Sequence, residues 1–289
     1  MQQTFEQRKS GNVRVSRKSR TPKRKVNAAT ASHSPKVGVA ISVILGNTVG
    51  FTGTKERACM TISLNDFDFA IVLFLNKFVG KSRLLDGLVQ LISDKPILGG
   101  VLFVALLWLI WFKDKREQSR IRLLIGGVAA VLAGLLSRLL QLALPFHVRP
   151  LYNTDLTLTW PIGVERGPLH HWSSFPSDHA ALFFALATLI WISDRRLGLF
   201  AFFWAAITSS TRIYLGYHYP TDILGGAALG VFMVILFQRL PLPRVVYRLL
   251  DWERFHSPSF YTVAFIASYQ AGTLFDDVRA IGQLIVQSL

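Results

Sequence analysis

The chain has 289 residues, of which 51% are hydrophobic and only 17% are charged, and its mean hydropathy is +0.37. This composition excludes an ordinary soluble domain and is typical of a membrane protein with several spans. The single cysteine, Cys59, excludes an internal disulfide, and the net charge of +15 is spread unevenly along the chain.

The first 36 residues form a strongly basic tail that holds ten Lys and Arg residues and a single acid, Glu6. The tail has too few large apolar groups to offset the entropy cost of ordering, so we expect it to be disordered. Next to membrane spans, such a tail typically fixes topology or contacts anionic lipid, and we expect no nucleic acid partner. Two alternatives stay open: the tail is an organelle transit peptide, or translation starts at Met60 and the tail is absent.

Two weak apolar stretches follow, at 37–53 and 67–80, and the second is interrupted by Asp68, Asn76 and Lys77. Residues 81–93 are amphipathic, and we expect them to lie in the membrane interface. Five later stretches have the length and hydropathy of spans: 96–112, 123–144, 176–193, 197–213 and 220–238. Together with one weak stretch they predict an all-α, polytopic membrane helix bundle with about six transmembrane helices.

The far end of the chain, residues 258–275, is apolar but broken by Gln270 and Gly272, which predicts a half-buried helix. We therefore divide the chain into a basic tail with a weak apolar stretch (1–60), a membrane core (61–245) and a C-terminal interfacial helical segment (246–289). Basic residues gather at 113–122, 195–196 and 239–248, which predicts that these regions are cytoplasmic in a cell (inner) membrane. The loops 145–175 and 212–220 then face the extracytoplasmic side.

Two blocks of polar residues lie in the first of these outward loops. Arg149 follows a span that is broken at Pro145, and its guanidinium can bind phosphoryl oxygens. In the run Phe175–His179 (FPSDH), the chain enters a helix through Pro176, so that free backbone N–H groups face the loop. Ser177 and the backbone of Asp178 can bind a phosphate there, and His179 can protonate a leaving oxygen.

A third block, Thr211–Asp222 (TRIYLGYHYPTD), precedes the last span. If that helix begins near Pro220, Asp222 lies about one turn from His218 and can hold one imidazole nitrogen by a hydrogen bond. The other nitrogen would then be free to act as a nucleophile, and Arg212 offers a second guanidinium for phosphate.

These three blocks, Arg149-Pro150, Pro176-Ser177-Asp178-His179 and Arg212…His218…Asp222, resemble the motif set of the type-2 phosphatidic acid phosphatase family over about residues 65–240. The resemblance implies that His218 is the nucleophile that becomes phosphohistidine, that Asp222 orients it and that His179 is the general acid. The phosphate ligands that it implies are Arg149, Ser177, Asp178 and Arg212. It implies no metal and no cofactor, and it leaves the oligomeric state open.

The chain departs from the family pattern at Leu142, because the family has a lysine seven residues before the arginine of the first block. Arg138, one helical turn earlier, and His147, nearer the membrane edge, are two candidates to replace this cation. A structural pairing role is the alternative for Arg138. Asp178 stands where the family often has Gly, so its carboxylate has to point away from a bound phosphate.

The sequence therefore predicts an integral-membrane, metal-independent phosphatase that hydrolyses a lipid phosphate or diphosphate on the extracytoplasmic face. Its partners would be this substrate and the surrounding membrane lipids. Undecaprenyl diphosphate is the favoured substrate, followed by phosphatidic acid and phosphatidylglycerophosphate. The missing cation at Leu142 motivates the alternative, a catalytically weak family member that binds lipid or acts as a scaffold. A vanadate-dependent haloperoxidase is disfavoured on the same ground.

Overall fold

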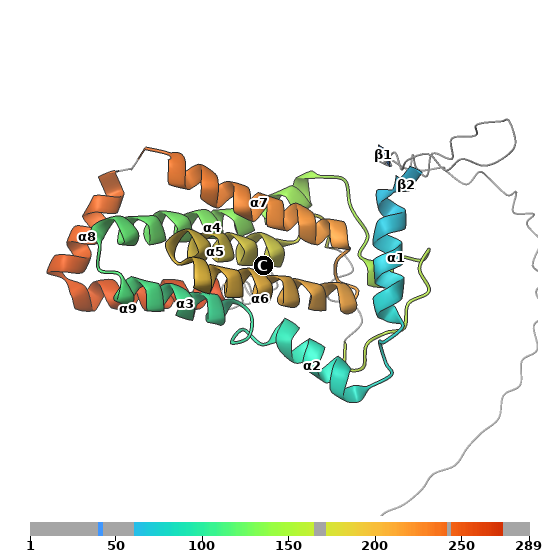
Figure 1. Ribbon diagram of the computed structural model, residues 1–289. Helices are drawn as coiled ribbons and strands as arrows, with labels where there is room; N and C mark the ends of the chain where they lie inside the picture. Colours follow the sequence, from blue (N-terminus) through green and yellow to red (C-terminus); the bar gives the residue numbers. More distant parts are fainter. Residues whose placement is uncertain (1–39, 43–60, 165–171, 242–243, 274–289) are drawn as a thin grey trace, which may run out of the picture. The chain divides into compact units, whose positions relative to one another are not determined.

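The computed structural model describes residues 40–42, 61–164, 172–241 and 244–273 (Figure 1). Strands β1 (Ala40–Ser42) and β2 (Thr61–Ser63) pair antiparallel, with Ala40 opposite Ser63. The helices are α1 (Leu64–Asn76), α2 (Arg83–Asp94), α3 (Gly100–Lys113), α4 (Glu117–Ala143), η1 (Pro150–Tyr152), α5 (Asp178–Ser193), α6 (Arg195–Tyr214), α7 (Pro220–Arg239), α8 (Arg244–Phe255) and α9 (Ser257–Gly272). The predicted disordered tail at 1–36, the Met60 start and residues 274–289 lie outside the described residues.

The predicted helical class is confirmed, because the five strong apolar stretches form α3 to α7. The amphipathic segment forms α2, the second weak stretch forms α1, and the apolar segment near the C-terminus forms α9. Helix α4 begins at Glu117, six residues before the predicted start at 123. Hydropathy detects only the apolar part of a helix, whereas Glu, Gln and Arg also favour helix and extend it. In the stretch 37–53, only Ala40–Ser42 are described, and they form a strand.

The number of membrane spans remains a prediction. Among the described helices, α4 and α7 have both the length and the hydropathy of a span, while α3 and α5 are apolar but shorter. Helix α6, which the sequence also predicted to cross, belongs to neither group. Its last two turns contain the polar run Thr208–Arg212, and this end contributes to the candidate site instead of a purely apolar surface.

Helix α5 lies at the centre of the bundle and packs against α3, α4, α6 and α7 (Figure 1). It is apolar around its whole circumference, as expected of a helix with neighbours on every side. Helix α7 approaches it most closely at two glycines spaced four residues apart. A Cβ at Gly226 would lie 2.3 Å from the Ser177 carbonyl oxygen, and one at Gly230 would lie 2.1 Å from that of Ala181. Small residues therefore allow the two backbones to touch.

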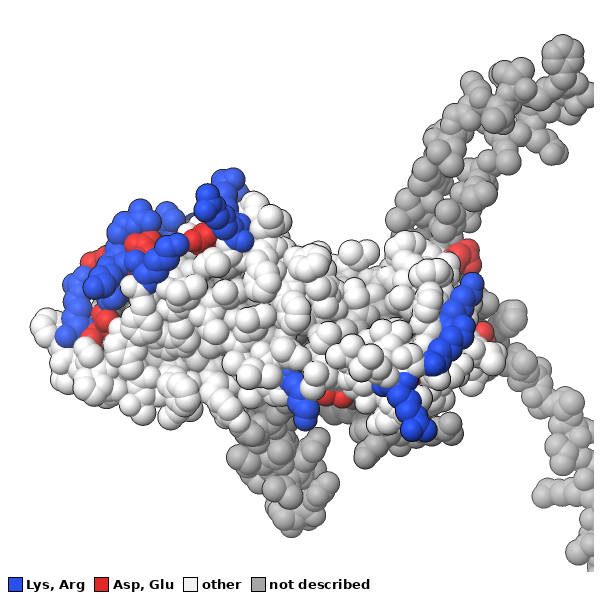
Figure 2. All heavy atoms as spheres, turned by 60° about the horizontal axis from the view of Figure 1, so that its bottom comes forward, with Lys and Arg blue, Asp and Glu red and all other residues white. Residues whose placement is uncertain are grey.

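The three basic regions that we predicted to share one side do lie together. Lys113 pairs with Asp194 at the start of α6 at 3.0 Å, and Gln238 at the end of α7 donates to the Arg122 carbonyl at 2.9 Å. Figure 2 shows a cluster of Lys and Arg with a few acids at this end, a broad surface of other residues along the bundle, and smaller groups of Lys and Arg toward the opposite end. This pattern is typical of a membrane-embedded bundle, and the cytoplasmic position of its basic end stays a prediction.

Helices α8 and α9 are attached to this basic end by a connected polar network. Arg120 of α4 pairs with Glu253 of α8 at 2.7 Å, and the Tyr261 hydroxyl of α9 donates to the same carboxylate at 2.8 Å. The Trp111 indole of α3 donates in turn to the Tyr261 oxygen at 3.2 Å. Because α3, α4, α8 and α9 each contribute a member, the network fixes α9 along α3.

The close approach of α5 and α7 generates a testable prediction. Gly230→Ala should lower the free energy of unfolding by about 1–3 kcal/mol, because the added methyl group meets backbone atoms that cannot move aside. Gly127→Ala on α4 is the matched control: no atom lies within 4 Å of its added Cβ, so this variant should gain up to about 1 kcal/mol of helix propensity. Thermal unfolding of the purified protein in detergent compares the two. Equal transition temperatures for Gly230→Ala and wild type would contradict the packing argument.

Candidate active site

The predicted site residues meet at the end of the bundle opposite the basic network. Helices α5 and α7 start there, α6 ends there, and the loop after α4 crosses between them. The backbone N–H of Ser177 donates to the Asp222 carbonyl at 3.0 Å, which joins the second and third sequence blocks directly. Arg149 of the first block lies 3.5 Å from the ring of His218, measured from Nη1 to Nε2.

His218 is 2% exposed and is held by a backbone group. Its Nδ1 lies 2.9 Å from the Ser174 carbonyl oxygen and 3.6 Å from Oδ2 of Asp222. The expected hydrogen bond from His218 to Asp222 is thus replaced by one from His218 to the Ser174 carbonyl, and the carboxylate contributes its charge from slightly farther away. A carbonyl can only accept, so we assign the proton to Nδ1 and leave Nε2 with its lone pair. Burial lowers the pKa of His218, although the neighbouring Asp222 carboxylate opposes this shift.

Asp222 is fully buried, and its carboxylate serves two partners besides His218. Oδ2 accepts the backbone N–H of Tyr219 at 2.7 Å, which satisfies a free donor at the start of α7. Oδ1 faces Nδ1 of His147 at 3.4 Å, and this contact raises the pKa of His147 above its usual value. His147, which we considered as a replacement cation, therefore lies beside the orienting acid.

His179 and Arg212 are in direct contact. Nε2 of His179 lies 2.5 Å from Nη2 of Arg212, and Nδ1 lies 2.9 Å from Oδ1 of Asp178. Because the guanidinium is always a donor, Nε2 is an acceptor here and Nδ1 carries the proton. His179 can act as a general acid through Nε2 only after Arg212 has moved to another acceptor, such as a phosphate oxygen, and Nε2 has taken up a proton.

Ser177 and Asp178 shape the first turn of α5. The Ser177 hydroxyl accepts the N–H of Ala180 at 3.3 Å and caps the helix. The Asp178 carboxylate folds back onto its own helix, where it accepts the backbone N–H of His179 at 2.9 Å. Its Oδ2 lies 3.9 Å from Nη1 of Arg138.

Arg149 is 5% exposed and is surrounded by carbonyl groups. It donates to the carbonyls of Trp172, Ser173 and Tyr217 at 3.1, 3.3 and 2.8 Å. These contacts hold two loops together and fix the guanidinium next to His218.

The structure shows which side chains lie near Leu142, where the family pattern has a lysine. Leu142 is 68% exposed and supplies no cation. Arg138 reaches the rim of the site, where its guanidinium stacks on the Trp172 ring at 3.7 Å, near Asp178. It also donates to Gln141 at 2.7 Å. The structure thus gives Arg138 both a pairing contact and a position at the site.

Two acids that we did not predict as site residues hold the third block at both ends. Asp86 of α2 is fully buried and accepts the Tyr214 hydroxyl at 2.5 Å and the Ile162 N–H at 3.2 Å. Asp68 of α1 accepts the N–H of Thr221 at 3.0 Å. The sequence does contain a signal for both residues, because each is an acid within an apolar or amphipathic stretch. Burying such a charge raises the free energy of the folded state unless the group has a partner. Among the described residues, no group of three His, Cys, Asp or Glu side chains is placed to hold a metal ion.

The Asp86 contacts generate a prediction about stability. Asp86→Ala should lower the free energy of unfolding by about 1.5–3 kcal/mol, since a buried hydroxyl and a backbone N–H lose a charged acceptor. Asp251→Ala, at an exposed position on α8, is the control and should change it by less than about 0.5 kcal/mol. Thermal unfolding in detergent measures both. A similar small effect of the two variants would contradict the assigned role of Asp86.

The two loop histidines should titrate in a defined order. On acidification from high pH, His147 should bind a proton above pH 6.5 because its pKa is raised, and His218 should do so only below pH 6.5 because its pKa is lowered. Because the pKa of His147 is higher in the folded state, its protonation stabilises that state as the pH falls towards 6.5. Because the pKa of His218 is lower in the folded state, the unfolded chain binds this proton first below pH 6.5, and the free energy of unfolding declines. Nitrogen-15 NMR of the histidine rings, assigned with His147→Gln and His218→Gln, measures the order. The reverse order would contradict the geometry.

The segment that contains this site matches a known family. Residues 145–245 match the family described as the PAP2 superfamily. The chain is 27% identical over 158 residues to the undecaprenyl-diphosphatase BcrC of Bacillus subtilis (strain 168), which covers 55% of this chain and 76% of that protein. It is 49% identical over 65 residues to the lipid A 4'-phosphatase of Bacteroides thetaiotaomicron, which covers 22% of this chain and 29% of that protein.

The chain was also compared with solved structures. The crystal structure of Aquifex aeolicus LpxE aligns with a TM-score of 0.46 and 20% sequence identity, over 60% of this chain and 96% of that chain. The segment 145–245 contains all seven residues that the sequence predicted for the site, from Arg149 to Asp222. The predicted resemblance is thereby confirmed for this segment, which matches the PAP2 superfamily.

Proposed function

We propose that the protein is an integral-membrane phosphatase that hydrolyses a lipid phosphate or diphosphate through a phosphohistidine at His218. The observation that carries the proposal is the setting of this ring: Nδ1 is held by the Ser174 carbonyl, and Nε2 is 3.5 Å from the Arg149 guanidinium. A neutral imidazole with a fixed tautomer beside a cation is suited to attack phosphorus.

The first step forms a bond between Nε2 of His218 and phosphorus. Once Arg212 has left His179, Nε2 of His179 takes up a proton from solvent, while Nδ1 keeps its own. The bond from phosphorus to the leaving oxygen then breaks, and that oxygen takes the Nε2 proton. Arg149, Arg212 and Ser177 would bind the phosphoryl oxygens, and the approach of the phosphate would draw Arg212 away from His179. The Asp222 carboxylate, 3.6 Å from the ring, stabilises the positive charge that forms on His218.

The second step is the attack of water on phosphorus. The bond to Nε2 of His218 breaks, His179 takes up a proton from the water, and inorganic phosphate leaves. Apart from the substrate and water, the participants in these steps are groups of the chain, and the proposed reaction needs no metal.

The relatives support a lipid substrate. The similar proteins are named as enzymes that act on undecaprenyl diphosphate and on lipid A, which are both phosphorylated amphiphiles. Undecaprenyl diphosphate is the favoured substrate, with phosphatidic acid or phosphatidylglycerophosphate next. The site would lie on the extracytoplasmic face of the inner membrane, because the basic loops lie at the other end of the bundle.

The second candidate function is lipid binding or scaffolding without efficient turnover. It is favoured by Leu142, which leaves one cation fewer than the family pattern, and by Arg149, whose guanidinium already serves three carbonyl groups. A member of this kind would bind phosphorylated lipid but release phosphate slowly.

Phosphate release from a panel of lipid substrates in detergent with EDTA separates these functions. Wild type should hydrolyse at least one of them, and His218→Ala should be slower by at least about 10³-fold, because the nucleophile is lost. His256→Ala, at the exposed junction of α8 and α9, is the control and should leave the rate unchanged. Equal rates for wild type and His218→Ala would refute the assigned nucleophile. No release by a folded wild type that still binds lipid would favour the second function.

A further inference from the structure

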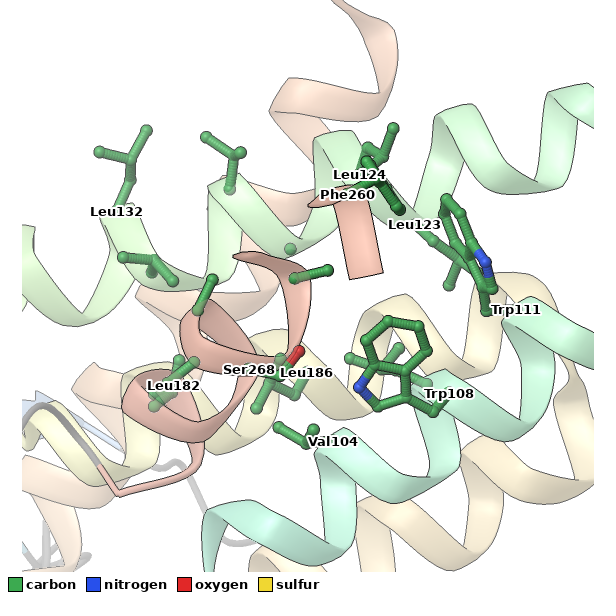
Figure 3. Close-up of a pocket in the computed structure, with 17 residues that line it drawn as sticks. Val104, Trp108, Trp111, Leu123, Leu124, Leu132, Leu182, Leu186, Phe260 and Ser268 are labelled. Atoms are coloured by element: carbon green, nitrogen blue, oxygen red, sulfur yellow. The ribbon is translucent and has the colours of Figure 1, made fainter. Parts of the chain in front are cut away.

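An apolar cavity of about 390 Å³ lies between α3, α4, α5 and α9, away from the polar groups of the site. Figure 3 shows Trp108 and Trp111 on one wall, Leu132 on another, and Leu182 and Leu186 from the central helix. Apart from the two indoles, the Ser268 hydroxyl is the polar side-chain group of this lining. Cavities with such walls hold hydrocarbon in preference to water.

Along α5, the cavity lies next to the candidate site. Leu182 and Leu186 follow His179 by three and seven residues on α5, so all three lie on one face of that helix. At a rise of 1.5 Å per residue, the two leucines lie about 5 and 10 Å farther along the helix axis.

A stripe on α4 connects the rim of the site with the same cavity. Exposed apolar residues recur there at alternating intervals of four and three residues, which keeps them on one face. They are Val128, Leu132, Leu135, Leu139 and Leu142. Val128 and Leu132 line the cavity, and the other end of the stripe reaches the turn that contains Arg138, whose guanidinium is 3.9 Å from Asp178.

The α9 wall is fixed in place. Trp111 lines the cavity and also donates to Tyr261, which is bound to the Arg120–Glu253 pair. Of the lining residues, Leu182 and Leu186 of α5 lie within the segment 145–245 that matches the family, whereas those of α3, α4 and α9 lie outside it.

We propose that this cavity binds the hydrocarbon tail of the phosphorylated lipid whose head enters the site. The proposal rests on the proposed function and extends it, because the phosphate would lie among Arg149, Arg212 and His218 while the tail follows the α4 stripe into the cavity. Within a membrane the tail is already in an apolar medium, so the gain comes from van der Waals contact with the walls. The enzyme would therefore select its substrates by the length of the tail as well as by the phosphate.

Gly127 provides a specific test because it lines the cavity and no atom lies within 4 Å of a Cβ added there. Its neighbour Gly126 differs, since an added Cβ would lie 2.3 Å from Leu189. Gly127→Leu should therefore fill the cavity without disturbing the contact between α4 and α5. Ala267→Leu introduces the same bulk from the α9 wall.

The experiment compares kcat/KM for undecaprenyl diphosphate and dimethylallyl diphosphate, which share an allylic diphosphate head and differ in tail length. Gly127→Leu and Ala267→Leu should each lower the value for the long substrate by about fivefold or more, through lost wall contacts, and leave the short one unchanged. Gly87→Leu is the matched control: it is also a helical glycine with no atom within 4 Å of the added Cβ, but it lies on α2 outside the cavity lining.

The outcomes separate the two proposals. Unchanged hydrolysis of the long substrate by either cavity variant, or an equal loss on both substrates, overturns the tail site. If a folded wild type hydrolyses neither of these substrates and no other lipid phosphate, the proposed function itself is refuted. A loss confined to the long substrate in both cavity variants and absent from Gly87→Leu supports the tail site.

Discussion

The candidate site depends on the contact between the backbones of α5 and α7. Gly226 and Gly230 remove the side chains that would separate the two helices, and the Ser177 N–H then reaches the Asp222 carbonyl at 3.0 Å. This contact brings the start of α5, with its serine and histidine, next to the start of α7, with its histidine and aspartate. Two motifs about forty residues apart in the sequence become one site because small residues allow the backbones to touch.

The arrangement also explains how several charged groups coexist in an apolar bundle. Each cation has protein acceptors: Arg149 donates to three carbonyls, and Arg212 contacts His179 and the Ser93 carbonyl. Each acid has donors, as Asp68 and Asp86 have from the third block and its flanks. Buried charge is tolerated in this setting because donors and acceptors are already matched.

The sequence predicts a large part of this structure. The apolar stretches predict α3 to α7, and the spacing of polar residues at their ends predicts which side chains meet. The partners of those side chains are harder to predict. The carbonyl of Ser174 takes the place that we assigned to Asp222, and the carbonyls around Arg149 come from a loop whose backbone path leaves no pattern in the sequence. Asp68 and Asp86 are visible as acids in unusual surroundings, but only the fold shows that both reach the third block.

The contact between Arg212 and His179 has a consequence for product release. A phosphate that takes over the Nη2 donor of Arg212 has to break this 2.5 Å contact, so part of the binding free energy is used to separate the two side chains. The same contact re-forms when phosphate leaves, which favours dissociation of the product as much as it weakens binding of the substrate. A site built in this way gives up some affinity for phosphate and gains resistance to inhibition by the phosphate that it would produce.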